Sequence, residues 1–165
     1  MSRPIRVMVV DDSAVVRQVM SQIFKQAPGF ELLGAHSDPV FAQSRMASNW
    51  PDVVVLDVEM PRMDGITFLR HIMSTRPTPV VICSTLTTRG AATTLAAMQA
   101  GAFEIVEKPG SSVRDQLTGM GQRLIEVVRQ AASANVQQLA RRAAAASPSG
   151  TAADAAARAE RRAQA

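Results

Sequence analysis

The feature that most constrains the fold of this chain is a regular alternation of short apolar runs with amphipathic stretches between residues 5 and 130. This alternation is typical of a parallel sheet with helices on both faces. The expected strands cover residues 5–10, 30–34, 52–56, 79–83 and 103–107. The first, third and fourth of these runs are continuously apolar, which predicts burial on both faces. The other two are shorter and partly alternating, as expected nearer the sheet edges.

Five helical stretches alternate with these strands. The first follows Ser13, a plausible N-cap, and the next three begin near Asp38, Gly65 and Thr87. The fifth follows Pro109. With right-handed crossovers, the pattern predicts an α/β fold with a five-stranded parallel sheet, a flavodoxin-like strand order of 2-1-3-4-5 and five flanking helices. The functional crevice of such a sheet lies at the carboxyl ends of the strands.

Composition and charge exclude several classes of protein. No apolar run approaches the roughly 20 residues that span a bilayer, and no secretory cleavage site follows Met1, so we expect a cytoplasmic protein without membrane insertion. The net charge of +4 arises entirely in residues 111–165. The arginines there are diluted among alanines and lack interleaved aromatic residues, so no nucleic-acid partner is expected. The lone Cys83 lies in an apolar run and is interpreted as a buried strand residue.

The same change of composition suggests the domain organisation. Residues 1–131 contain all the expected strands and helices and are interpreted as one domain. Residues 132–165 are rich in alanine and arginine and are interpreted as a linker that is helical at its start and then disordered. A tract without large apolar residues is expected to have nothing to bury.

Three acidic residues follow two strands that the topology makes neighbours. Asp11 and Asp12 follow the first strand, and Asp57 follows the third. Carboxylates brought so close together repel one another unless a cation lies among them. Hard oxygen ligands favour Mg²⁺, or Mn²⁺ in its place. The sequence therefore predicts a divalent metal site in the crevice, although each aspartate taken singly is better read as a loop cap.

Two further strand ends supply groups that suit a phosphorylated carboxylate. Ser84 follows the fourth strand and offers a hydroxyl, and Lys108 follows the fifth and offers a cation. A carboxylate nucleophile, a metal, a cation and a hydroxyl form a phosphoryl-transfer site, in which catalysis is mainly positioning and charge stabilisation.

These residues resemble the signature of two-component response-regulator receiver domains over residues 5 to about 130. The motifs are Asp11-Asp12-Ser13 with Arg17, the run from Asp57 to Gly65, Ser84, and Lys108-Pro109. The resemblance implies a CheY-like fold in which Asp57 is the phosphoacceptor. It implies metal binding by Asp12, Asp57 and the carbonyl of Glu59, with Asp11 acting through water. The implied phosphoryl contacts are Val58, Ser84, Thr85 and Lys108.

A narrower resemblance is to the receiver half of the chemotaxis protein-glutamate methylesterase, CheB. It is carried by residues 76–81, 84–90, 57–61 and 101–103. In that family a linker and a Ser-His-Asp esterase domain follow the receiver. The resemblance implies a chemotaxis histidine kinase as phosphodonor, and the methylesterase domain or chemoreceptors as partners. For this chain alone we expect no esterase activity, because His36 and His71 both fall in elements of the receiver core.

Two other functions remain open at this point. One is a free-standing receiver that acts as a protein-binding switch or as a phosphate sink. The other is a phosphohydrolase of the haloacid dehalogenase type. Those enzymes carry an Asp-x-Asp pair on the first strand, whereas this chain has Asp57-Val58-Glu59 on the third.

Overall fold

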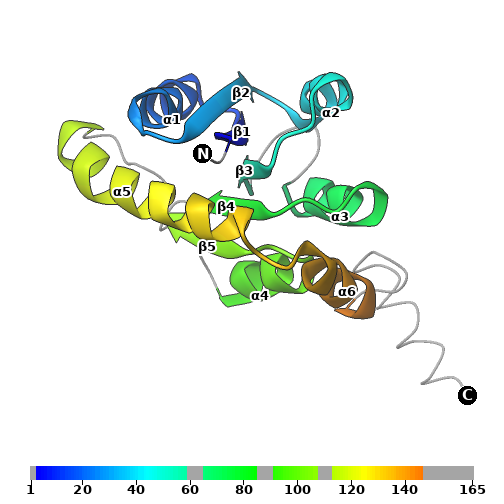
Figure 1. The fold of residues 1–165 in the computed structure, drawn as a ribbon. Helices are drawn as coiled ribbons and strands as arrows, with labels where there is room; N and C mark the ends of the chain where they lie inside the picture. The colour runs from blue at the N-terminus through cyan, green and yellow to red at the C-terminus, as the bar shows by residue number, and fades with distance from the viewer. Residues whose placement is uncertain (1–2, 59–64, 85–90, 108–112, 147–165) are drawn as a thin grey trace, which may run out of the picture.

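The computed structural model describes residues 3–58, 65–84, 91–107 and 113–146 of the chain. Its core is a five-stranded parallel sheet in the order β2-β1-β3-β4-β5, so the predicted topology is confirmed (Figure 1). The strands are β1 (Ile5–Val10), β2 (Phe30–His36), β3 (Val53–Asp57), β4 (Val80–Ser84) and β5 (Glu104–Glu107). β3 and β4 each begin and end one residue later than predicted, so that Asp57 and Ser84 are the last residues of their strands.

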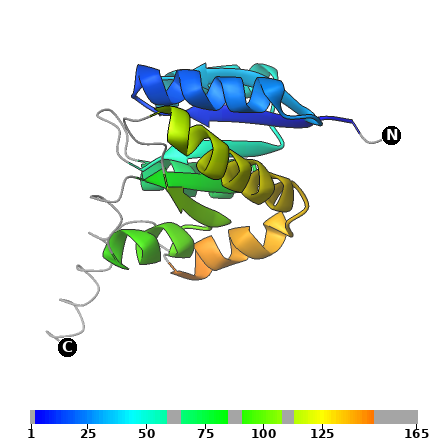
Figure 2. The ribbon, with the colours of Figure 1, turned by 90° about the vertical axis from the view of Figure 1, so that its left-hand side faces the viewer.

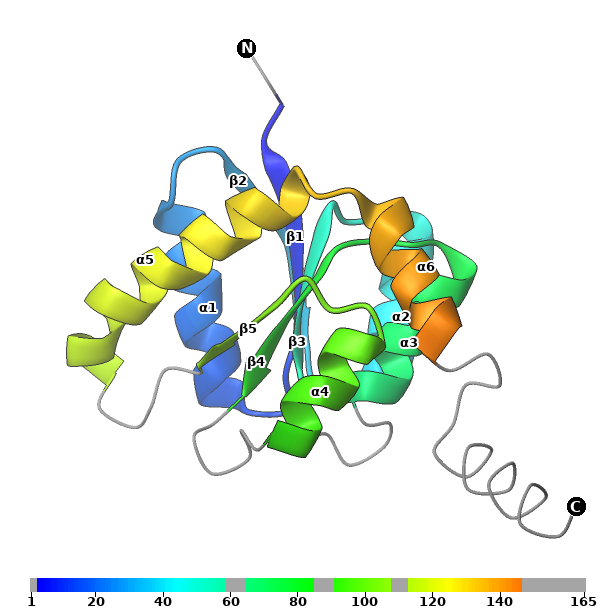
Figure 3. The same ribbon diagram turned by 90° about the horizontal axis from the view of Figure 1, so that it is seen from below.

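Helices cover both faces of the sheet. Looking along the sheet in Figure 3, α1 and α5 lie on one side, and the remaining helices lie on the other. The helices are α1 (Ala14–Gln26), α2 (Pro39–Ser48), α3 (Gly65–Thr75), α4 (Ala91–Gln99), α5 (Val113–Ala132) and α6 (Val136–Ala146). The described residues thus contain six helices, namely the five flanking helices that the sequence predicted and α6, which lies in the tract expected to be helical at its start.

The alternation of side chains along the strands divides the core into two layers. Val7 and Val9 of β1 belong to the apolar cluster that α1 and α5 cover, whereas Met8 and Val10 belong to the cluster that α2, α3 and α4 cover. All five residues of β3 and of β4 are buried, as their continuously apolar sequences predict. The edge strand β2 is only partly buried.

Local sequence signals fix where the first two helices begin. The side chain of Ser13 accepts a hydrogen bond from the amide of Val16 (3.3 Å), which makes Ser13 the N-cap of α1 as predicted. Asp38 caps α2 in the same way by accepting from the amide of Phe41 (2.9 Å). Capping satisfies amides that have no partner inside the helix, and it places the first turn of α1 directly after Asp12.

The sixth helix corrects one expectation about the alanine-rich tract. Leu139 of α6 is only 6% exposed and joins the core cluster on the α3 side, with Ala140 and Ala143 packed against it. The tract therefore does bury apolar surface between residues 136 and 146. One leucine among alanines gives no strong apolar periodicity, so the sequence does not predict this burial. Residues 147–165 lie outside the described part of the chain.

Candidate functional site

The parallel register of β1 and β3 brings their carboxyl ends to the same level. Val10 pairs with Leu56, so the next residues along the two strands, Asp11 and Asp57, emerge side by side. Asp12 follows Asp11 before α1 begins. The topology thus places all three acids at one edge of the sheet, as the sequence predicted.

The three carboxylates form a compact cluster. One carboxylate oxygen from each of Asp11, Asp12 and Asp57 lies within 4.8 Å of the other two. Asp11 and Asp57 are 1% and 3% exposed, whereas Asp12 is exposed to solvent. Two buried carboxylates this close repel each other strongly when ionised, and a third at the surface adds to the negative potential. The cluster is open to solvent on the Asp12 side.

Hydrogen bonds from three elements hold Asp11 in place. Its amide donates to the carbonyl of His36 at the end of β2 (3.0 Å). Its side-chain Oδ1 accepts from the amide of Ser13 (2.8 Å), and its own carbonyl accepts from Nη1 of Arg17 (2.7 Å). Arg17 thus ties the first turn of α1 to the site. The sequence motif includes Arg17, but its spacing alone did not indicate this bond to the backbone.

Asp57 is held by the close approach of α3. The amide of Gly65, the first residue of α3, donates to the carbonyl of Val58 (2.8 Å). A Cβ atom at position 65 would overlap the carbonyl oxygen of Asp57 and would lie 2.8 Å from the Cα of Val58. Glycine is therefore required where α3 meets the end of β3. The sequence motif includes Gly65, but the packing role of this residue follows only from the structure.

Ser84 lies at the end of the next strand along the sheet. β3 and β4 pair Asp57 with Cys83, which places Ser84 one residue beyond that pair. Ser84 is 2% exposed, and none of the described residues forms a hydrogen bond with its hydroxyl. A buried hydroxyl without a partner is costly unless another group uses it. The hydroxyl of Ser84 is therefore available for a hydrogen bond to a group that the described residues do not supply.

Some of the predicted site residues lie outside the described part of the chain. These are Glu59, Thr85 and Lys108. Lys108 directly follows Glu107, the last residue of β5, which pairs with Ser84. Val58 is described and is 7% exposed, immediately after Asp57.

The donor set fits a hard divalent cation. Three carboxylates whose oxygens lie within 4.8 Å offer only oxygen ligands, and one of the three is open to water. Mg²⁺ is usually bound by one or two carboxylates together with several waters, which matches this arrangement of buried and exposed acids. A cation would also relieve the repulsion between Asp11 and Asp57.

Comparison with known families agrees with this geometry. The model of the response regulator receiver domain matches residues 7–118, which include β1 from Val7 onward, the acidic cluster and Ser84. The chain belongs to the response regulator receiver domain family. Its membership argues against the phosphohydrolase reading, in which an Asp-x-Asp pair would lie on the first strand, whereas the acids after β1 are the adjacent Asp11 and Asp12.

The receiver domain is similar to part of several longer curated proteins. It is 54% identical over 143 residues to protein-glutamate methylesterase/protein-glutamine glutaminase 1 of Pseudomonas savastanoi pv. phaseolicola, which covers 87% of this chain and 40% of the relative. It is 58% identical over 139 residues to protein-glutamate methylesterase/protein-glutamine glutaminase 2 of Xanthomonas campestris pv. campestris, with 84% and 40% covered. The chain thus spans about 40% of the length of these relatives.

Solved structures give the same picture. The response regulator domain of Thermotoga maritima CheB is 38% identical with a TM-score of 0.72, covering 81% of this chain and 99% of that chain. A chain from the complex of the CheA3 P1 domain with CheY6 of R. sphaeroides is 29% identical, with a TM-score of 0.67 and coverage of 81% and 100%. The receiver domain is therefore CheB-like in sequence and structure. Among its described helices, none has the length and apolar character needed to cross a bilayer.

The two histidines of the receiver domain, His36 and His71, lie outside the carboxylate cluster. The ring of His36 packs edge-on against Phe41, with 5.3 Å between ring centroids. Burial, followed by the positive charges of Arg45 and Arg17, lowers the pKa of His36 despite the opposing charge of Asp38. The neutral form of the His36 imidazole is therefore favoured over the charged form. His71 is exposed on α3.

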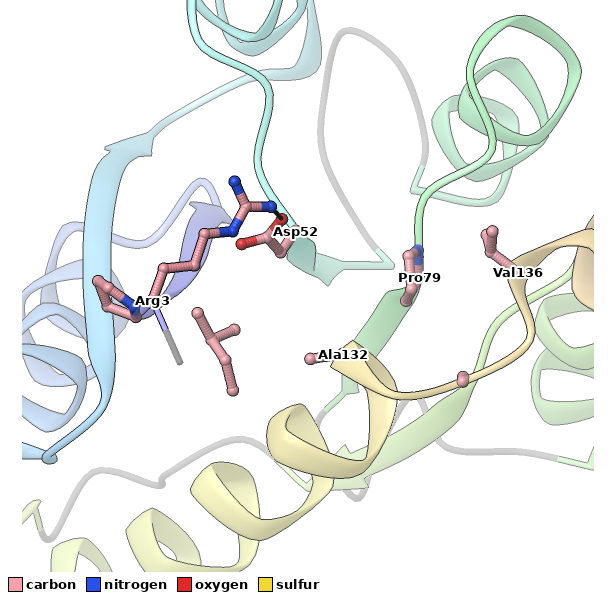
Figure 4. Close-up of a pocket in the computed structure, with 8 residues that line it drawn as sticks. Arg3, Asp52, Pro79, Ala132 and Val136 are labelled. Atoms are coloured by element: carbon pink, nitrogen blue, oxygen red, sulfur yellow. Dashed lines mark hydrogen bonds and ion pairs between the residues drawn. The ribbon is translucent and has the colours of Figure 1, made fainter. Parts of the chain in front are cut away.

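A separate pocket of about 300 Å³ lies at the opposite, amino-terminal edge of the sheet. It is lined by the segment before β1, by Asp52 and Pro79, and by the α5–α6 connection (Figure 4). An ion pair between Arg3 and Asp52 (3.2 Å) crosses its rim. Asp52 precedes β3, whereas Asp57 ends it, so the pocket is separate from the carboxylate cluster.

Proposed function

We propose that this receiver domain is a phosphorylation-controlled switch in which Asp57 accepts a phosphoryl group. The observation that carries the proposal is the cluster of Asp11, Asp12 and Asp57, whose carboxylate oxygens lie within 4.8 Å of one another at the ends of β1 and β3. In the reaction, an oxygen of Asp57 forms a bond to phosphorus as the bond from phosphorus to the donor breaks. The donor retains the electron pair of that broken bond.

The surrounding residues have distinct tasks in this scheme. Asp11, Asp12, Asp57 and the Glu59 carbonyl would hold Mg²⁺ or Mn²⁺, and the cation supplies positive charge that offsets the charge of the transferring phosphoryl group. Ser84 donates its hydroxyl to one phosphoryl oxygen, and Lys108 offers its ammonium group to another. Val58 and Thr85 provide the remaining contacts. The buried hydroxyl of Ser84, without a partner among the described residues, supports its role.

Intact-mass spectrometry tests the phosphoacceptor. Treatment with acetyl phosphate and Mg²⁺ should add the mass of one phosphoryl group, and chelation of the metal should abolish the addition. Asp57→Asn should prevent it. Asp38→Asn is a matched control because asparagine caps a helix as well as aspartate does, so this variant should be phosphorylated normally. Phosphorylation of Asp57→Asn at another residue of the cluster would refute the assignment.

We also infer a place in chemotaxis signalling from the curated relatives. The chain is 54% and 58% identical to segments of two protein-glutamate methylesterases, and it covers about 40% of each. The proposed phosphodonor is a chemotaxis histidine kinase, and the proposed location of this chain is the cytoplasm. The proposed output is control of a protein-glutamate methylesterase domain that acts on chemoreceptors, and such a domain would have to be supplied by residues beyond this segment.

Two assays test this second step. A phosphorylated chemotaxis kinase should transfer its phosphoryl group to this chain much faster than an unrelated histidine kinase does. A protein that joins this receiver to a methylesterase domain should release methanol from methylated receptors faster after phosphorylation, whereas the 165-residue chain should release none. Equal transfer from both kinases would argue against a chemotaxis role while leaving the chemistry at Asp57 intact.

A further inference from the structure

The chain continues beyond α5 into a helix that folds back over the receiver. α5 ends at Ala132, and α6 begins at Val136. The side chain of Asn135 accepts a hydrogen bond from the amide of Gln138 (3.2 Å) and so caps α6. α6 contacts α3 and α4: Figure 2 shows it beside α4, and Figure 3 shows it beside α3.

The contact surface of α6 is apolar and continuous with the core. Leu139 is 6% exposed and lies in the same cluster as Met73 of α3 and Ala97 of α4. Ala140 and Ala143 pack against this cluster. The other face of the helix carries exposed polar residues, namely Gln137, Gln138, Arg141 and Arg142. α6 is therefore amphipathic, with one large apolar side chain inserted between two helices.

The carboxyl end of α4 is shaped to receive α6. The amides of Gly101 and Ala102 donate to the carbonyls of Met98 and Ala97, which ends the helix in a Schellman motif with Gly101 at a φ of +105°. A Cβ at position 101 would lie 3.1 Å from the carbonyl oxygen of Leu139. Glycine therefore serves both the turn and the close approach of α6.

A polar contact closes the same junction. Nη1 of Arg142 donates to the carbonyl of Met98 at 3.4 Å. The carbonyl end of a helix carries partial negative charge, so a guanidinium group there is favourable. α6 is thus held both by the core and by the end of α4.

The two helices that hold α6 both connect to the phosphorylation site. α3 starts at Gly65, against the backbone of Asp57, and α4 is the helix that follows β4 and Ser84. A phosphoryl group adds a charge of about −2 and new acceptor oxygens. Donation from Ser84 to such an oxygen would draw the end of β4 toward Asp57 and displace α4 relative to α3. Because α6 packs against both α3 and α4, such a displacement would disrupt its packing.

α6 depends on its packing against α3 and α4 for its helical structure. It has 11 residues, and isolated helices shorter than about 12–15 residues are marginal in water. Undocking would therefore also unwind it. Such an element has two discrete states, docked helix and released coil, as a switch requires.

We propose that α6 is an intramolecular strap that joins α3 to α4 in the unphosphorylated receiver and is released when Asp57 is phosphorylated. The inference rests on the function proposed above. Coupling between two sites is reciprocal: if a bound phosphoryl group or its mimic weakens docking of α6 by some factor, docked α6 weakens binding of that group by the same factor, so a variant that releases α6 can raise the affinity by up to that factor. The strap would then report phosphorylation directly to whatever follows it in the chain.

Hydrogen–deuterium exchange on the full chain tests the proposal without any core mutation. Beryllofluoride with Mg²⁺ serves as the phosphoryl mimic. Amides of residues 136–146 should exchange about fivefold faster or more when it is bound, in line with typical coupling between sites. The Asp57→Asn variant should show no change in these residues.

The reciprocal experiment measures beryllofluoride affinity. Leu139→Ala weakens the packing of α6 against α3 and α4 and should raise the affinity for beryllofluoride about fivefold. Ala143→Leu, which wedges α6 away from Gly101 without leaving a cavity in the core, should act in the same direction. Gln137→Ala is the matched control, because residue 137 is on the exposed face of the same helix, and it should leave the affinity unchanged.

The outcomes separate this inference from the proposed function. If beryllofluoride slows exchange at the ends of β1 and β3 but leaves residues 136–146 unchanged, the strap is refuted and the phosphorylation site stands. If the mimic slows exchange in α6, the proposed direction of coupling is wrong. If neither beryllofluoride binding nor phosphorylation of Asp57 occurs, both proposals fail together.

Discussion

Gly65 lies directly against the backbone of Asp57, so that any Cβ at position 65 would overlap the Asp57 carbonyl oxygen. The same glycine donates its amide hydrogen to the carbonyl of Val58 at 2.8 Å. The start of α3 and the end of β3 are thus packed as one unit. The position of the proposed phosphoacceptor depends on a residue that has no side chain.

Replacement of Gly65 should therefore damage both the fold and the site. We expect Gly65→Ala to lower the free energy of unfolding by about 2 kcal/mol, because the methyl group forces the backbone apart. Phosphorylation of Asp57 by acetyl phosphate should also slow. Gly121→Ala is the control: its Cβ would lie 3.5 Å from Ile23, an ordinary contact, and it should stabilise α5 by about 0.5–1 kcal/mol. Urea denaturation measures both, and an unaffected Gly65→Ala would contradict the packing argument.

The buried hydroxyls of Ser84 and Thr78 should respond in opposite ways to removal. Thr78 accepts from Nε1 of Trp50 (2.7 Å) and donates to the carbonyl of Arg76 (2.9 Å), whereas the hydroxyl of Ser84 has no partner among the described residues. Thr78→Val should cost about 1–3 kcal/mol of stability and leave beryllofluoride binding intact. Ser84→Ala should leave stability unchanged or raise it, yet weaken beryllofluoride binding. Unfolding curves with and without the mimic distinguish these patterns.

Asp52 should make stability depend on pH in the acid range. Burial would raise the pKa of its carboxyl, but hydrogen bonds from Arg6 and the charges of Arg6 and Arg3 hold that pKa below its ordinary value. Because the pKa is depressed in the folded state, this stabilisation is present above the pKa of the unfolded chain and is lost as the pH falls through the folded-state pKa.

The corresponding variant is Asp52→Asn. It should lower the free energy of unfolding at pH 7 by about 0.5–1 kcal/mol, a small value because the ion pairs are partly exposed. The stability difference between wild type and variant should shrink as the pH falls through the folded-state pKa of Asp52 and disappear below it. Glu126→Gln, which removes an exposed carboxyl on α5, is the control and should change the free energy of unfolding at pH 7 by less than about 0.5 kcal/mol. A stability difference that persisted at low pH would point to packing rather than charge.

Leu139 should contribute to the stability of the whole domain. Because it is 6% exposed within the core cluster, Leu139→Ala should lower the free energy of unfolding by about 2–3 kcal/mol in a single cooperative transition. The exposed Gln137→Ala should change it by less than about 0.5 kcal/mol. The sequence alone predicts a domain that ends at residue 131, and for such a domain Leu139→Ala would have only a small effect. The measurement therefore also decides the domain boundary.

The fold was largely predictable because its signals are local. Continuous apolar runs predicted β1, β3 and β4, and the caps Ser13 and Asp38 predicted the starts of two helices. Strand order followed from the handedness of parallel crossovers. The strand ends were displaced by one residue at Asp57 and Ser84, since a polar residue at the end of a run can still pair in the sheet.

The sequence by itself determined which residues share the functional edge, because parallel strands deliver their carboxyl ends to one side whatever packs around them. It therefore identified Asp11, Asp12, Asp57 and Ser84. Only the tertiary structure decided how closely elements approach. The contact between Gly65 and Asp57 and the burial of Leu139 depend on surfaces contributed by distant segments. No local pattern records those distances, because a glycine or an alanine-rich helix acquires its role from the surface that meets it.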